Sequence, residues 1–314
     1  MNNLKTSQTD VSIIIVNFNT LELTKNCIDS ICEKTQDVKY EIIVVDNASV
    51  DNSPNVLSKD KRIKFIALDK NVGFGRANNI GYTHSSGKYV FLLNSDTIIV
   101  NNAIKLFYDK MEQSSNQIAC MGTLLFTDQS CTIHGHSYAK FLSGFQSLYY
   151  LFFDRTFSKL GIKLKKRDFD YITTYHTFFQ VPRLIGADMF IRRDVIKECG
   201  LFDPDFFMYY EETEMQFRYT KKGYFIYIYT LPQIIHLEGQ SANKESAKKS
   251  LWMIQQMTKS QLLYVKKTSK SILYKFFYKI ALSSVFFSFS ILHPRYNFIE
   301  KKECLKHLYK ILKL

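Results

Sequence analysis

Short apolar runs alternate with longer amphipathic stretches along the first part of the chain. The runs are rich in β-branched residues and bounded by polar turn residues, which is typical of strands buried on both faces of a parallel sheet. The predicted strands cover residues 11–16, 41–45, 63–68 and 88–93, and the predicted helices cover residues 20–35, 73–85 and 101–113. This alternation predicts a Rossmann-like α/β fold with a mostly parallel sheet flanked by helices. We expect the side chain of Thr20 to cap the first helix.

Polar residues follow three of the predicted strands. They are Asn17 and Asn19, then Asp46 and Asn47, then Asn94, Ser95 and Asp96. Ligands of such sheets bind beyond the carboxyl ends of the strands, so these tips predict a binding crevice at one sheet edge. Alternatively, these asparagine, aspartate and serine residues only form turns and helix caps. For any one strand tip considered alone, this alternative is favoured. Neither a GxGxxG nor a GxxxxGK[ST] motif occurs, which argues against a dinucleotide or P-loop site.

Composition indicates the class and the compartment of the protein. With 314 residues, 46% hydrophobic and 23% charged, the chain is long and apolar enough for one globular domain and an appendage. The six cysteines are scattered without a CxxC pair, which predicts neither a zinc site nor a disulfide framework. The polar N-terminal stretch lacks the apolar segment of a secretion signal. We therefore expect an intracellular protein with reduced thiols.

The positive charge is concentrated at the C-terminal end. Residues 241–314 hold 15 Lys and Arg against three acidic residues, so they carry +12 of the net charge of +13. Their high apolar content argues against a nucleic acid partner. It is typical of basic amphipathic helices that lie on an anionic membrane surface. Two alternatives remain: a membrane span over 276–292, for which 17 residues are marginal, or helices that pack on the rest of the chain or on a second subunit. The oligomeric state is left open.

Seven sequence blocks, taken together and in order, resemble those of the family 2 glycosyltransferases, especially a bacterial rhamnosyltransferase-like branch. The blocks are VSIIIVNFNT, EIIVVDNASVDNS, NVGFGRANNIG, GKYVFLLNSDT, GADMFIRRDV, FDPDFFMYYEETEMQFR and IIHLEG, which lie between residues 11 and 239. The resemblance implies the GT-A fold. It also implies a division into a catalytic domain over 1–240 and a basic, apolar helical tail over 241–314.

The resemblance implies that the strand tips bind the nucleotide of a nucleotide-sugar donor. Asp46 would contact the pyrimidine or the ribose, and Asn17 and Asn19 would frame the base. Arg76 would reach the pyrophosphate, although an exposed arginine on a helix face without a ligand is the alternative.

The resemblance also implies a divalent cation, Mg²⁺ or Mn²⁺, on the donor diphosphate. The DxD motif of the family reads Asn94-Ser95-Asp96 here. We assign Asn94 and Ser95 to the nucleotide site, and only Asp96 offers a carboxylate to the cation. His236 would be a second ligand; the alternative is a histidine of the apolar core.

The FFMYYEETEMQF stretch at residues 206–217 places acidic residues beside aromatic ones. By resemblance, Glu212 would be the general base that deprotonates the acceptor, with Glu211 beside it. The aromatic residues would raise the pKa of the base and provide apolar faces for a sugar ring. Alternatively, these acidic residues only form the first turn of a helix, where the helix dipole stabilises negative side chains. Glu214 would contact the sugar or instead hold Arg218.

Two further segments are assigned to the sugars. Gly186 and Ala187 would let the donor sugar approach the backbone, and Asp188 would hydrogen-bond it. Residues 140–180 would cover the acceptor. His134 and His136 are interpreted as loop residues.

The sequence thus predicts an inverting, metal-dependent glycosyltransferase at the cytoplasmic face of the cell membrane. Its donor would be dTDP-rhamnose and its acceptor a lipid-linked or cell-surface glycan. A nucleotidyltransferase and an inactive glycan-binding membrane scaffold are the alternatives. The first would be expected to carry a basic, glycine-rich loop after the first strand, which is not found there.

Overall fold

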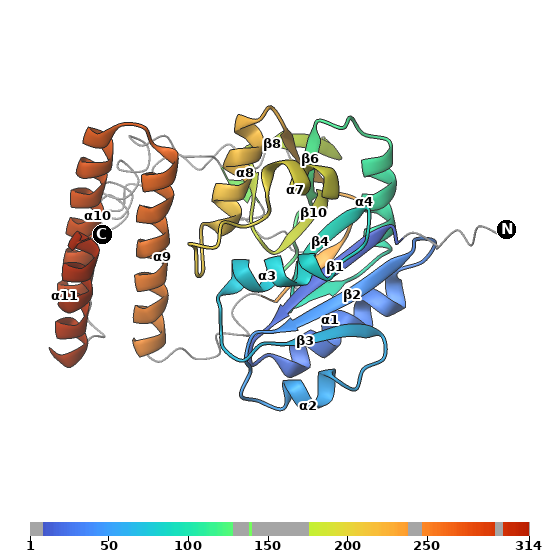
Figure 1. The fold of residues 1–314 in the computed structure, drawn as a ribbon, viewed down its shortest axis with the longest axis horizontal. Helices are drawn as coiled ribbons and strands as arrows, with labels where there is room; N and C mark the ends of the chain where they lie inside the picture. Colours follow the sequence, from blue (N-terminus) through green and yellow to red (C-terminus); the bar gives the residue numbers. More distant parts are fainter. Residues whose placement is uncertain (1–8, 128–137, 140–175, 238–246, 293–297, 314) are drawn as a thin grey trace. The chain divides into compact units, whose positions relative to one another are not determined.

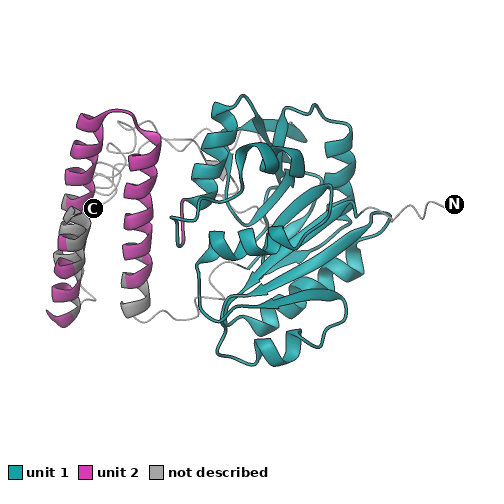
Figure 2. Ribbon diagram, viewed as in Figure 1, with its two compact units in different colours: residues 1–140, 176–207, 211–243 teal, residues 141–175, 208–210, 244–314 magenta. Residues whose placement is uncertain are grey.

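Figure 1 shows the computed structural model of the chain, which describes residues 9–127, 138–139, 176–237, 247–292 and 298–313. The chain forms two compact units (Figure 2). Unit 1 consists of residues 1–140, 176–207 and 211–243, and unit 2 consists of residues 141–175, 208–210 and 244–314. His134, His136 and residues 140–175 of the expected acceptor segment lie outside the described residues.

An eight-stranded sheet forms the centre of unit 1, in the order β3-β2-β1-β4-β10-β6-β11-β8. The strands are β1 (Val11–Asn17), β2 (Tyr40–Asp46), β3 (Ile63–Ala67), β4 (Tyr89–Asn94), β6 (Ile118–Gly122), β8 (Phe178–Val181), β10 (Asp188–Arg192) and β11 (Phe225–Tyr229). Strands β3, β2, β1 and β4 are mutually parallel, as are β6 and β11. Strands β10 and β8 run antiparallel to their neighbours. The predicted strands and the mostly parallel sheet are confirmed.

Helices cover both faces of this sheet. They are α1 (Leu21–Lys34), α2 (Ser53–Leu57), α3 (Phe74–Thr83), α4 (Ala103–Glu112), α7 (Arg193–Cys199) and α8 (Glu211–Lys221). Ile13 and Ile15 of β1 pack in the core that includes residues of α1 and α4. Ile14 packs in the core that includes residues of α3, α7 and α8. Because successive side chains point to opposite faces, a strand covered on both sides needs apolar residues in succession, as Ile13, Ile14 and Ile15 provide in β1.

Thr20 does not cap α1 in the expected way. Its side chain makes no capping hydrogen bond to the helix. Its Oγ1 instead donates to Oδ1 of Asn17 at 3.0 Å, while its backbone oxygen accepts from the Thr24 amide. The prediction was wrong: the Thr20 hydroxyl is directed to Asn17 at the tip of β1 and accepts no hydrogen bond from the amides of the first turn of α1.

Two short sheets extend unit 1. Strand β5 (Thr97–Ile99) pairs antiparallel with β12 (Ile234–His236), which places His236 opposite Thr97. Strand β7 (Tyr138–Ala139) pairs with β9 (Arg183–Leu184). The first of these pairings brings the end of unit 1 back to the tip of β4.

In the described part of unit 2 there are three long helices, α9 (Ala247–Thr268), α10 (Ile272–Leu292) and α11 (Phe298–Lys313). Val265 of α9 packs with Tyr278 and Leu282 of α10 in a small apolar cluster. The side chain of Gln261 also donates to the Tyr278 hydroxyl. Among the described residues, no helix combines the length and the apolar character needed to cross a membrane.

Candidate active site

The tips of β1 and β2 are joined through Asn17, which is fully buried. Its Nδ2 donates to Asp46 Oδ1 at 2.6 Å and to Ser49 Oγ at 3.0 Å. Its Oδ1 accepts from the hydroxyls of Thr20, at 3.0 Å, and Thr24, at 2.7 Å. An asparagine side chain has two donor hydrogens and two acceptor lone pairs. All four of these hydrogen-bonding positions of Asn17 are taken by protein atoms. Asn17 can therefore affect a ligand only by positioning the residues around it.

Asp46 and Asn19 shape the loop that follows β2. Oδ2 of Asp46 accepts from the Ser49 amide at 3.0 Å. Asn19, in a left-handed conformation with φ of 56°, donates its backbone N–H to Ser49 Oγ and accepts from the Val50 amide. Phe18 and Val50 remain exposed at the rim, with exposed fractions of 44% and 91%. The two loops therefore form one hydrogen-bonded unit with an apolar edge.

Ser95 ties the tip of β4 to this unit. Its Oγ lies 3.2 Å from Oγ1 of Thr20. The structure thus brings together all three polar strand tips.

The expected cation ligands lie together at the β4 tip. Nε2 of His236 is 3.2 Å from Asp96 Oδ1 and 3.5 Å from Asn94 Nδ2. The Leu237 amide donates to the Asp96 backbone oxygen at 2.9 Å, which fixes the two segments against each other. Oδ1 of Asn94 is buried and has no hydrogen-bond partner.

These residues fit a cation bound mainly through a substrate. Carboxylate, amide oxygen and imidazole are ligands that Mn²⁺ and Mg²⁺ accept. No cluster of three or more His, Cys, Asp or Glu suited to a metal occurs in the described ranges. Such a sparse set suits a cation whose remaining ligands are phosphate oxygens and water.

Residues 186–188 connect this cluster to the acids of α8. The Ala187 carbonyl accepts from the Asn94 amide at 2.9 Å. A Cβ added at Gly186 would lie 3.4 Å from Glu212 Cγ, so the absence of a side chain there leaves room for that glutamate. Two neighbouring residues thus lie next to the expected base and the cation cluster respectively.

Asp188 points into the protein. Its Oδ2 accepts from the Thr123 amide at 2.7 Å, and its buried Oδ1 has no partner. Burial raises the pKa of this carboxyl well above its usual range. Asp188 is thus suited to anchoring the end of β10, and no sugar contact follows from its position.

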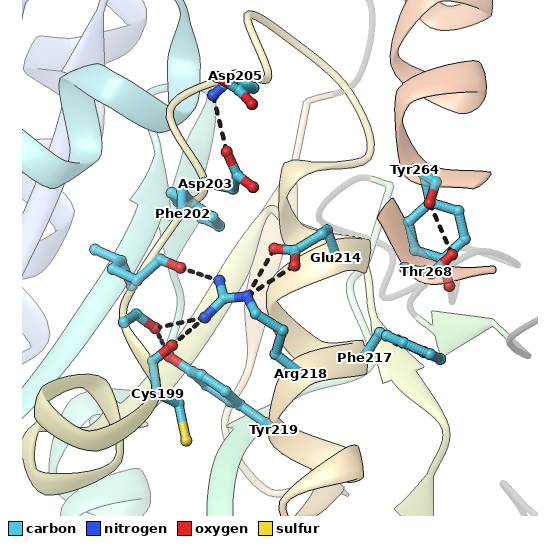
Figure 3. Close-up of polar contacts among 12 residues, drawn as sticks. Cys199, Phe202, Asp203, Asp205, Glu214, Phe217, Arg218, Tyr219, Tyr264 and Thr268 are labelled. Carbon is cyan, nitrogen blue, oxygen red and sulfur yellow. Dashed lines mark hydrogen bonds and ion pairs between the residues drawn. The ribbon is translucent and has the colours of Figure 1, made fainter. Parts of the chain in front are cut away.

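The three acids of α8 have different surroundings. Oε1 of Glu212 lies 3.6 Å from Arg183 Nη1 and accepts from the Thr213 hydroxyl at 2.8 Å. Glu214 accepts from Arg218 Nε at 2.8 Å, and the Arg218 guanidinium also donates to the carbonyls of Cys199, Gly200 and Leu201 (Figure 3). Glu214 therefore holds the arginine that satisfies the C-terminal end of α7.

Glu211 is buried, and its Oε2 has no hydrogen-bond partner. Burial, with a smaller contribution from the neighbouring Glu212, raises the pKa of its carboxyl from 4.5 to about 8. At neutral pH this carboxyl is thus predominantly protonated.

Replacing Glu211 with glutamine should flatten the pH dependence of stability. The folded protein retains a proton that the unfolded chain loses, so this group's contribution to stability is complete below pH 4.5 and lost as the pH rises towards 8. Between pH 5 and 8 the unfolding free energy of the wild type should fall by on the order of a few kcal/mol more than that of Glu211→Gln. Urea unfolding at both pH values measures this difference. Equal slopes for the two proteins would refute the assignment.

Arg76 lies on α3 and is exposed. Its Nε donates to the Pro204 carbonyl at 2.6 Å. The same helix begins beside Gly73, where φ is 90° and an added Cβ would lie 2.2 Å from the Phe207 carbonyl oxygen. In this structure Arg76 ties α3 to the 202–207 segment.

A sequence model for the family described as Glycosyl transferase family 2 matches residues 12–200, more than half of the chain. The chain belongs to glycosyl transferase family 2. The family resemblance predicted from the sequence is confirmed.

Individual relatives of this family 2 glycosyltransferase cover smaller parts of it. Glycosyltransferase GlyG of Streptococcus pneumoniae is 26% identical over 112 residues, which span 34% of this chain and 37% of GlyG. Succinoglycan biosynthesis protein ExoO of Rhizobium meliloti is 29% identical over 112 residues, 35% of this chain and 32% of ExoO. The matched region thus spans only about a third of the length of either relative.

A solved structure shows the same fold over nearly the whole chain. The mannosyltransferase PcManGT of Pyrobaculum calidifontis, in complex with GDP-Man and Mn²⁺, aligns with a TM-score of 0.52 and 13% identity. The alignment covers 98% of this chain and 81% of PcManGT. This family 2 glycosyltransferase has the GT-A fold, as predicted.

Several residues of this glycosyltransferase site were missed by sequence reasoning. Thr24, Ser49 and Thr123 hold Asn17, Asp46 and Asp188, and Arg183 faces Glu212. None lies in a recognisable motif of charged residues, and three act through a hydroxyl or a backbone amide. The Glu214–Arg218 pair does carry a signal, the i,i+4 spacing of opposite charges on a helix.

Proposed function

We propose that this protein transfers a sugar from a nucleotide-sugar donor to an acceptor hydroxyl, with Glu212 as general base. One observation carries the proposal: Gly186 lies beside Glu212, while the Ala187 carbonyl accepts a hydrogen bond from the Asn94 amide of the cation cluster. A base and a diphosphate site on either side of one short segment are what a single-displacement transfer needs. The solved relative in complex with GDP-Man and Mn²⁺ supports it.

Asp96 and His236, with Asn94 beside them, would hold the cation, and Mg²⁺ or Mn²⁺ supplies charge stabilisation for the leaving diphosphate when bound. Glu212 takes the proton of the acceptor hydroxyl as that oxygen attacks the anomeric carbon. The bond from this carbon to the donor phosphate oxygen breaks, and its electron pair leaves with the nucleoside diphosphate. Attack opposite the leaving group inverts the configuration.

The strand tips would bind the nucleotide. Asp46 retains lone pairs for the ribose or the base, whereas Asn17 positions it. Asn19 and Ser95, with the loops in which they lie, would line the same crevice. Arg76 would have to break its hydrogen bond to the Pro204 carbonyl to reach a phosphate. Glu211, in its protonated form, would lie next to the general base Glu212 in the sequence and form the second member of the acid pair.

The finer proposal is rhamnose from dTDP-rhamnose and a glycan acceptor, lipid-linked or part of a surface polysaccharide. The donor rests on the resemblance of the seven blocks, and the acceptor class is supported by the succinoglycan relative. Purified protein with UDP-, GDP- and dTDP-sugars and Mn²⁺ tests both: nucleoside diphosphate should be released from one donor class. Release from none of them, with acceptor glycolipid present, would refute the function.

We further propose that residues 241–314 form the helical tail and attach the enzyme to an anionic membrane at its cytoplasmic face. Large apolar side chains are exposed on the first half of α10: Ile272, Leu273, Phe276, Phe277 and Ile280. Lys275 and Lys279 lie among them, in a tail with 15 basic and three acidic residues. An apolar face with a basic surround matches the acyl boundary and the charge of anionic lipid.

The full-length protein should therefore float with phosphatidylglycerol vesicles and leave them as salt is raised. Substituting both Phe276 and Phe277 with serine should weaken binding by at least about tenfold, because two aromatic side chains no longer enter the lipid. Phe225→Ser is the matched control, since Phe225 of β11 is also exposed. Equal binding to phosphatidylcholine vesicles, or equal loss in the control, would contradict the proposal.

A further inference from the structure

A fully buried glutamine side chain joins β9 to α8 within unit 1. Oε1 of Gln216 accepts from the Leu184 amide at 2.6 Å, and its Nε2 donates to the Leu184 carbonyl at 3.1 Å. The same Nε2 donates to the Glu212 carbonyl at 2.9 Å, one helical turn back. A side-chain amide that bonds both the N–H and the C=O of one residue reproduces the pairing of a neighbouring strand. Gln216 therefore fixes β9 beside the first turn of α8.

Close packing supports this junction between β9 and α8. Leu184 of β9 and Met215 of α8 are buried in the same apolar core. Further along the segment that follows β9, a Cβ added at Gly186 would lie 3.4 Å from Glu212 Cγ and 3.5 Å from Glu212 Cβ. Both elements belong to unit 1, drawn in teal in Figure 2. The backbone after β9 and the stem of Glu212 therefore have little freedom to move relative to each other.

Arg183, the residue before Leu184, directs its side chain to Glu212. Nη1 of Arg183 lies 3.6 Å from Glu212 Oε1, and the two side chains are only 21% and 16% exposed. Because so little of the pair faces water, the attraction between the charges is screened less than at an open surface. The same Oε1 accepts from the Thr213 hydroxyl at 2.8 Å. Two partners thus orient one oxygen of the Glu212 carboxylate.

The fold does not depend on this ion pair. Gln216 bonds the backbone atoms of Leu184, and the apolar packing involves Leu184 and Met215. The guanidinium of Arg183 takes part in neither. A charged side chain that the junction does not need, placed against the carboxylate assigned to proton transfer, indicates a role in the reaction.

We propose that Arg183 is a positioning residue for the general base: it orients Oε1 of Glu212, so that Oε2 is presented to the acceptor hydroxyl. The inference rests on the proposed function, because it assigns Glu212 to the transfer step. The acceptor proton moves to Oε2 while the acceptor oxygen forms its bond to the anomeric carbon. The bond from that carbon to the donor phosphate oxygen breaks, and its electron pair leaves with the nucleoside diphosphate. Arg183 itself neither gives nor takes a proton.

Substitutions of Arg183 in the full-length protein test the inference. Arg183→Ala removes the guanidinium, and Arg183→Lys keeps a positive charge. Arg62→Ala is the matched control. Arg62 also pairs with acids, Asp29 and Asp60, both at 2.7 Å, but it lies just before β3, at the end of that strand opposite to the strand tips. The measurements are kcat, KM for the acceptor and donor affinity with Mn²⁺.

We expect Arg183→Ala to lower kcat by at least about tenfold, since a displacement of about 1 Å can cost on the order of 10²-fold. The acceptor KM and the donor affinity should stay within about twofold of the wild type, because a residue that acts through the base affects the transition state and not substrate binding. Arg183→Lys should recover at least about a third of the wild-type kcat, since a contact at 3.6 Å depends on charge more than on bidentate geometry. Arg62→Ala should resemble the wild type.

A double mutant shows whether Arg183 acts through Glu212. In a Glu212→Gln background, Arg183→Ala should lower the residual kcat by less than about twofold, because residues that act as a unit have non-additive effects. A merely structural role of Arg183 would instead lower kcat by the same factor in both backgrounds.

Unchanged kcat in Arg183→Ala would overturn the inference, as would an equal loss in the Glu212→Gln background or in Arg62→Ala. A raised acceptor KM with unchanged kcat would also overturn it, because Arg183 would then bind the acceptor itself. The proposed function fails if the wild type transfers no sugar or if Glu212→Gln keeps near-normal turnover. The inference alone fails if Glu212→Gln loses turnover and Arg183→Ala does not.

Discussion

Replacing Glu212 with glutamine should lower kcat by roughly 10²- to 10⁴-fold, the usual cost of losing a positioned general base. Glutamine has nearly the same shape, so the space beside Gly186 remains filled and α8 should stay in place. Donor affinity should be retained, because the strand tips and the cation cluster do not include Glu212. Single-turnover transfer and donor titration, measured on the same preparation, separate the two quantities.

Two neighbouring acids provide controls for this result. Glu211→Gln should keep most of its turnover near pH 7, since glutamine resembles the protonated acid that burial favours there. Glu214→Gln should mainly lower stability, because it weakens the hold on Arg218. The base has been assigned to the wrong carboxylate if Glu212→Gln retains near-normal turnover while Glu211→Gln or Asp188→Asn loses it.

Replacing Asp96 with asparagine should abolish the gain in donor affinity that Mn²⁺ provides and lower kcat by about 10²- to 10³-fold, as expected when charge stabilisation of a leaving group is lost. The fold should be unaffected, because the Leu237 amide bonds the Asp96 backbone oxygen, which asparagine retains. Calorimetric titration of the donor with and without Mn²⁺ measures the effect.

Ser95→Ala is the matched substitution at the same strand tip. It removes only the contact to Thr20, so its donor affinity should keep the Mn²⁺ dependence. A wild-type protein that binds its donor equally well with and without Mn²⁺ would show that Asp96 has another role.

Local patterns predicted most of the sheet because β1 to β4 are apolar runs separated by amphipathic helices. What they did not predict is the insertion of β10, antiparallel, between β4 and β6. That pairing joins residues separated by a long stretch of chain, and the length of a run says nothing about its partner or direction. It is also this pairing that places Ala187 beside Asn94.

Side-chain environments were harder to predict than positions. The strand-tip residues were found because turns and ligand sites use the same residue types, yet their hydrogen-bond partners could not be read from the sequence. Asp188 and Glu211 were singled out as acids, but their burial depends on how β10 and α8 pack. Aromatic neighbours suggested a carboxyl of raised pKa, and the structure assigns that property to Glu211.

The fully used hydrogen-bonding capacity of the Asn17 side chain has an evolutionary consequence. Since its four hydrogen bonds all go to protein atoms, a substitution there would disturb two loops and the start of α1 at once. The rim residues Phe18 and Val50 are exposed and can be exchanged at little cost to folding. A lineage that acquires a new nucleotide preference would therefore diversify at the rim, with the buried amide inherited unchanged beneath it.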